Sequence, residues 1–132
     1  MAAREKSIEL TRKAALAAGE KLGRDLVAID LSEQMVLSEV FLLVTGGNEK
    51  QVEAIADEVE RSLALGGEKP ARKERTANWI LLDYSDLVVH IQSEELRSYY
   101  MLDRLWNDCP RIEIPQAQRD QVDLTTTSEA EK

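Results

Sequence analysis

Few side chains in this 132-residue sequence could carry out catalysis. The chain has one histidine, His90, and one cysteine, Cys109. A nucleophilic pair would need these two within hydrogen-bonding reach, and a metal site would need further ligands although there is no second histidine. With 25 acidic residues, neighbouring carboxylates are expected by chance. We therefore predict a structural or interface role for His90, and an ordinary packing role for Cys109.

Motifs that bind phosphates or metals are absent from the sequence: there is no GxxxxGK[ST], GxGxxG, HExxH or CxxC. Residues 45–51, TGGNEKQ, could receive a phosphate at a helix N-terminus. A strand-to-helix turn capped by Asn48 explains the same residues and is favoured. No cofactor and no metal are expected, and the chain is not expected to be an enzyme. Carboxylates such as Asp30, Glu33 and Glu39 are interpreted as solvated or capping groups.

Composition predicts one globular domain. Hydrophobic residues make up 43% of the chain and charged residues 32%, and no apolar run approaches the roughly 20 residues of a membrane span. The opening MAAREKSIEL does not resemble a signal peptide, so we expect a cytoplasmic protein without a membrane partner. The net charge of −8 opposes direct RNA contact. A protein partner is therefore favoured, despite the local basic run at 71–76.

Patterning predicts a single α/β domain with a mixed sheet of about five strands, spanning residues 1–115, and a polar mobile tail at 116–132. Asn48 and Gln51 form a capping-box pattern before a regular apolar stripe. Ser93 is the expected cap of the last long helix. The expected helices cover 7–22 with Gly23 as a stop, 48–65 and 93–106, and the expected strands cover 25–31, 39–46, 71–75, 79–84 and 87–92.

The segment WILLDYSDLVVHI, residues 79–91, reads as a hairpin. If Ser85 and Asp86 form the turn, alternation places one apolar set toward the core: Ile80, Leu82, Tyr84, Leu87, Val89 and Ile91. The opposite face then carries a mixed set: Trp79, Leu81, Asp83, Val88, His90 and Gln92. An aromatic anchor with apolar and hydrogen-bonding neighbours is typical of a protein interface, rather than of a second core or a solvated face.

The stretch 99–106, YYMLDRLW, has a stripe that usually belongs to a core. We expect Leu102, Leu105 and Trp106 to point mostly inward. Tyr99 or Tyr100 should be partly exposed, and both are secondary candidates for a contact surface.

Four segments appear in the order of a known family: DLVAIDLSEQMVLSEVFLLVTG, NEKQVEAIADEVE, WILLDYSDLVVHI and EELRSYYMLDRLWNDCPRI. Across residues 21–114 the chain resembles the ribosomal silencing factors, bacterial relatives of the plant Iojap protein. The resemblance implies an α/β fold similar to nucleotidyltransferases but without their catalytic acids. It also implies binding to the large ribosomal subunit through ribosomal protein L-fourteen, which sterically prevents small-subunit joining and represses translation when nutrients are short.

The resemblance and the hairpin pattern predict one partner-binding surface. Its residues are Trp79, Leu81, Asp83, Tyr84, Asp86, Val88 and His90, with Tyr99 and Tyr100 as secondary members. Tyr84 belongs to the motif although alternation points it inward, and Ser85 stands where the family commonly has glycine. Two alternatives stay open: a degenerate nucleotidyltransferase-like protein that binds nucleotides, and a homodimer formed through the hairpin face.

Overall fold

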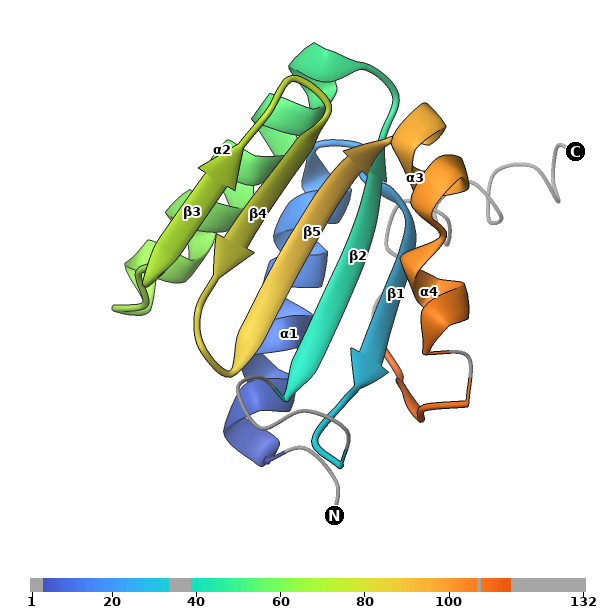
Figure 1. The fold of residues 1–132 in the computed structure, drawn as a ribbon. Coiled ribbons are helices and arrows are strands. Elements are labelled where there is room, and N and C mark those ends of the chain that lie inside the picture. The colour runs from blue at the N-terminus through green and yellow to red at the C-terminus, as the bar shows by residue number, and fades with distance from the viewer. Residues whose placement is uncertain (1–3, 34–38, 107, 115–132) are drawn as a thin grey trace, which may run out of the picture.

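A six-stranded mixed sheet forms the centre of the computed structural model, which describes residues 4–33, 39–106 and 108–114. The strand order is β3-β4-β5-β2-β1-β6, and β2 and β5 are parallel whereas the other pairs are antiparallel. Helices α1 and α2 cover one face, and α3 and α4 cover part of the other (Figure 1).

The strands are β1 (Arg24–Asp30), β2 (Val40–Gly46), β3 (Arg72–Arg75), β4 (Trp79–Asp83), β5 (Leu87–Ser93) and β6 (Arg111–Ile112). The helices are α1 (Glu5–Glu20), α2 (Glu49–Leu65), α3 (Glu94–Tyr100) and α4 (Leu102–Leu105). The α/β class with a mixed sheet is confirmed, with β6 as a strand that the sequence did not predict.

Helix α2 begins at the predicted cap. Asn48 Oδ1 accepts from the Gln51 backbone N–H at 2.9 Å, and Gln51 Oε1 accepts from the Gly47 N–H at 2.7 Å. These bonds satisfy donors that a helix N-terminus leaves unpaired. The Gly47 and Gln51 N–H groups are therefore bonded within the chain, as the predicted capped turn requires.

Helix α1 ends differently from the prediction. Leu22, rather than Gly23, adopts the left-handed conformation, with φ of 66°. Gly23 is needed for space instead, since a Cβ at this position would lie 2.8 Å from both the Ala18 carbonyl oxygen and Val44 Cγ1. The glycine therefore permits the close approach of the helix end to β2.

The hairpin has the predicted register. Leu82 pairs with Val89 and Ile80 with Ile91, and Tyr84 N–H donates to the Leu87 carbonyl at 2.8 Å. The turn forces Ser85 to φ of 76°, a conformation that glycine adopts with less strain. The apolar face lies in the main core against α1 and α2, as predicted, and all six of its members are buried: Ile80, Leu82, Tyr84, Leu87, Val89 and Ile91.

The opposite sheet face has a second, smaller core, which the sequence analysis did not expect. Val88 packs there, and half-buried Trp106 covers the cluster. Its other buried members are Ile29, Leu31, Phe41, Leu43 and Cys109. The expectation of a purely interface-like outer face was therefore wrong for the part that lies on β5.

The predicted third helix is broken in two at Met101, which adopts φ of 50°. Ser93 caps α3 as predicted, accepting from the Leu96 N–H at 3.4 Å. The break turns Leu105 outward, so that it is 67% exposed, and its predicted inward position was wrong. The side chain of Leu102 and the predicted tail at 116–132 lie outside the described residues.

Candidate partner-binding face

The outer side of β4 remains largely uncovered. Trp79 and Leu81 are half-buried there, and beside them lies a hollow of about 270 Å³. Glu74 and Thr76, from β3 and its end, complete the lining of this hollow. We call the uncovered region the open face, and it consists of Arg72, Glu74, Thr76, Trp79, Leu81, Asp83, Tyr99 and Tyr100.

Strand β3 brings Glu74 to the open face because its charges alternate. Lys73 points to α2, where its Nζ lies 3.1 Å from Glu60. Arg72 and Glu74 occupy the other side of the strand and pair with each other at 2.9 Å. The opposite charges of β3 and α2 therefore neutralise one another, and an acid and a base are left on the open face.

Three aromatic rings run together from β4 to α3. The ring centroids of Trp79 and Tyr100 are 4.9 Å apart, as are those of Tyr100 and Tyr99. Tyr99 is 76% exposed, and Tyr100 is also exposed, so the predicted exposure of these two tyrosines is confirmed. Amphipathic aromatic rings of this kind are common anchors in protein interfaces.

His90 is buried beneath this surface and is not presented to a partner. Its Nδ1 accepts from Trp79 Nε1–H at 3.3 Å, and its ring lies 4.7 Å from that of Phe41. Burial lowers the pKa of His90 to about 4, so that the ring is neutral at pH 7. The arrangement gives His90 a positioning role: it holds the indole that faces outward. Val88 is also buried, as part of the second core.

The predicted acidic contacts already have partners within the chain. Asp83 Oδ1 accepts from the Ser85 N–H at 2.8 Å, which supports the strained turn. Its other oxygen lies 3.8 Å from Arg72 Nε. Asp86 Oδ1 accepts from Arg4 Nη2 at 2.9 Å. A partner cation would have to compete with these two arginines.

Tyr84 lies in the main core, as alternation indicated and contrary to its place in the predicted surface. Burial raises the pKa of its hydroxyl to about 12. Its side chain is therefore a packing group in this structure.

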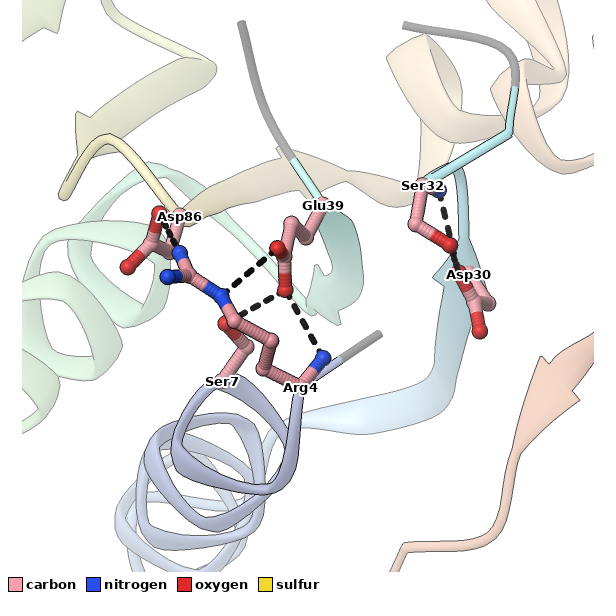
Figure 2. Close-up of polar contacts among 6 residues, drawn as sticks. All are labelled: Arg4, Ser7, Asp30, Ser32, Glu39 and Asp86. Atoms are coloured by element: carbon pink, nitrogen blue, oxygen red, sulfur yellow. Dashed lines mark hydrogen bonds and ion pairs between the residues drawn. The ribbon is translucent and has the colours of Figure 1, made fainter. Parts of the chain in front are cut away.

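A carboxylate cluster closes the start of α1 (Figure 2). Arg4 provides no side-chain cap for this helix. Instead Glu39 accepts from the Arg4 backbone N–H at 2.9 Å, from Arg4 Nε at 2.8 Å and from Ser7 Oγ at 2.8 Å. The first of these bonds is the main reason that the pKa of Glu39 lies below its usual value. Glu39 thus has a structural role at the start of α1, and nearby Asp30 accepts from Ser32 in its own local turn.

The described residues contain neither a metal-binding cluster nor a membrane-spanning helix. None of them forms a group of three or more histidine, cysteine or acidic side chains able to hold a metal ion. Within the same residues, every helix is too short or too polar to cross a bilayer.

The fold and the open face define a small α/β protein with helices on both sides of a mixed sheet, and comparison with known proteins specifies it further. Residues 4–132 match the family described as ribosomal silencing factor during starvation. The chain belongs to the ribosomal silencing factor family.

Relatives agree with this assignment. The chain is 35% identical over 108 residues to the ribosomal silencing factor RsfS of Halalkalibacterium halodurans, covering 80% of this chain and 92% of that protein. It is 27% identical over 108 residues to the chloroplastic protein Iojap of Zea mays, covering 76% of this chain but 45% of Iojap. A crystal structure of a Chromobacterium violaceum protein superposes with a TM-score of 0.72 at 28% identity, covering 83% of this chain and 94% of the other. A Bacillus halodurans crystal structure gives 0.70 at 34% identity, covering 80% and 97%.

Proposed function

We propose that this protein binds the large ribosomal subunit through ribosomal protein L-fourteen, using the open face. Bound there, it sterically blocks association with the small subunit and so represses translation under nutrient limitation. The family assignment supports a role at the ribosome, since the bacterial relatives are named ribosomal silencing factors. The site of action is the cytoplasm, and the mechanism needs occupancy alone, without a catalytic group.

The observation that carries this proposal is the fixed position of Trp79. The His90 ring holds the indole N–H, and Tyr100 packs against the indole ring. A tryptophan whose orientation is already set loses little side-chain entropy on binding, and a large preorganised aromatic ring is the usual centre of a binding hot spot. The hollow next to it can receive an apolar side chain of the partner.

Charge supports a basic protein as the partner. The chain has a net charge of −8, and on the open face the two acids Glu74 and Asp83 share a single arginine, Arg72. Long-range attraction accelerates encounter between oppositely charged surfaces. The same negative charge is unfavourable for broad contact with ribosomal RNA, so we expect little direct RNA binding.

Sedimentation with separated ribosomal subunits tests the proposal. The protein should travel with free large subunits, and adding it before small subunits should reduce the fraction of joined ribosomes. Leu65→Ala is the control for substitutions on the open face, because Leu65 is an exposed hydrophobic residue at the end of α2, on the other side of the sheet. This variant should behave as the wild type does. Cosedimentation with joined ribosomes, or with neither subunit, would contradict the proposal.

A further inference from the structure

Gln92 is the least explained residue of the outer sheet face. It is 0% exposed, and neither its amide nitrogen nor its amide oxygen has a hydrogen-bond partner among the described residues. An amide buried without partners destabilises a fold, and such groups are uncommon in native proteins. A leucine would fill the same place without this penalty, so packing does not account for a glutamine here.

The neighbours of Gln92 show what covers it. In the sheet, Gln92 lies between Trp79 on β4 and Thr45 on β2. Helix α3 contacts the sheet at both of these neighbours: Arg97 Nη1 donates to Thr45 Oγ1 at 2.8 Å, and Tyr100 packs on Trp79. The amide therefore lies beneath α3, between two of the helix's contacts with the sheet.

Helix α3 is held by polar and aromatic contacts, which include an ion pair between Glu94 and Arg24, and not by buried side chains. None of its seven residues is buried. Its C-terminal end is Met101, which adopts φ of 50° and separates it from α4. Elements with few buried apolar contacts open at the lowest free energy, and a left-handed residue between two helices can act as the hinge.

A second polar group lies beside Gln92. Because His90 Nδ1 accepts from Trp79, the neutral ring carries its proton on Nε2. This Nε2–H is also buried without a partner among the described residues. The buried outer side of β5 therefore has three unpaired groups: the donor and the acceptor of the Gln92 amide, and the Nε2–H donor of His90.

We propose that α3 is a movable cover, and that the Gln92 amide is a contact for the ribosomal-protein partner that becomes available when α3 is displaced. A carboxamide pairs best with a group that offers one donor and one acceptor, and a peptide bond of an extended partner segment does so. The inference rests on the proposed function. It extends the partner surface from Trp79 to Gln92, and Trp79 keeps its bond to His90 when α3 and its Tyr100 move away.

Two matched substitutions test this inference. Gln92→Leu removes the buried amide, and Tyr84→Phe removes another buried polar atom without a partner, which lies on the other sheet face in the main core. Each removal of an unpaired buried group should raise Tm, by roughly 5 °C. Gln92→Leu should also weaken large-subunit binding about tenfold, whereas Tyr84→Phe should leave binding unchanged. Thermal unfolding and cosedimentation titrations measure the two quantities.

The outcomes separate this inference from the proposed function. If the wild type binds large subunits and Gln92→Leu binds equally well, the movable-cover inference is wrong while the proposed function holds. A lower Tm for Gln92→Leu, repeated with Gln92→Met to exclude a packing defect, would show that the amide is already satisfied in the free protein, and would overturn the inference. If the wild type itself fails to bind, the proposed function fails.

Discussion

The outer sides of β4 and β5 lie next to each other and have opposite environments. On β4, Trp79 and Leu81 are half-buried and border a hollow. On β5, His90, which is paired with Leu81, is buried, as is Gln92, which is paired with Trp79. Both strands follow the same alternation. The difference arises because β5 lies in the centre of the sheet under α3, whereas β4 lies one strand from its edge.

This contrast shows how a small sheet can support a contact residue from behind. The covered outer side of β5 also supports the open outer side of β4, because His90 accepts a hydrogen bond from the indole of Trp79. Substitutions of Trp79 and Leu81 on the open side should therefore alter binding, and substitution of His90 on the covered side should alter stability.

The largest expected effect compares two neighbours on β4. Leu82→Ala removes a fully buried side chain from the main core and should lower the free energy of unfolding by about 2–5 kcal/mol. Leu81→Ala, on the open side, should cost less than half as much, because Leu81 is only half-buried. Denaturant unfolding of both variants measures the difference, and equal losses would mean that the two faces are equally covered.

Acid should destabilise the covered half through His90. Its pKa is about 4 in the folded protein against 6.5 for an ordinary histidine, so the unfolded chain binds more protons between these values. Stability should be complete above pH 6.5 and should fall by about 3 kcal/mol as the pH drops to 4. Glu39, with a lowered pKa, adds a loss at the acid end, as the pH falls below its usual value of 4.5.

Unfolding curves recorded across this pH range test the assignment to His90. His90→Gln can still accept from the indole, but it does not titrate in this range. The variant should therefore lose the pH dependence between 6.5 and 4. If the slope persists, another group is responsible for it.

The third effect concerns binding by the open half. Trp79→Ala should weaken large-subunit binding by about 2 kcal/mol, roughly thirtyfold, because Trp79 is the largest preorganised anchor of the open face. Circular dichroism should show a folded domain. Unchanged affinity would place the contact surface elsewhere.

Light scattering of the same variant tests the alternative of a homodimer, which should become monomeric if it forms through this face.

The smallest effect lies in the turn that joins the two halves. Ser85 has φ of 76°, and glycine adopts this conformation with less strain. Ser85→Gly should raise the free energy of unfolding by about 0.5–1 kcal/mol and leave ribosome binding unchanged. Asp86→Gly in the same turn is the control, because it removes the ion pair with Arg4 and should not stabilise. A destabilised Ser85→Gly variant would show that the serine side chain itself supports the turn.

Local patterns were sufficient to predict the parts of the molecule that local forces determine. Asn48 caps α2 through bonds within four residues, and alternation assigned each hairpin residue to its face. Alternation along a strand does not predict which later segments of the chain will pack on either face. Nothing near His90 in the sequence indicates that α3 will pack on this strand, and the break at Met101 has no glycine or proline to mark it. The predicted surface therefore extended too far toward β5, where Val88 and His90 are buried, whereas Trp79 on β4 is accessible.

The bonds at the start of α1 also order events during synthesis. The first turn of this helix is closed by Glu39, and Arg4 is further held by Asp86. Both acids follow α1 in the chain and are still inside the exit tunnel when the helix emerges, so its first turn emerges unclosed. A chain stalled before Glu39 has emerged should leave this turn frayed, and the ion pair of Arg4 with Asp86 must wait until the hairpin turn has also emerged.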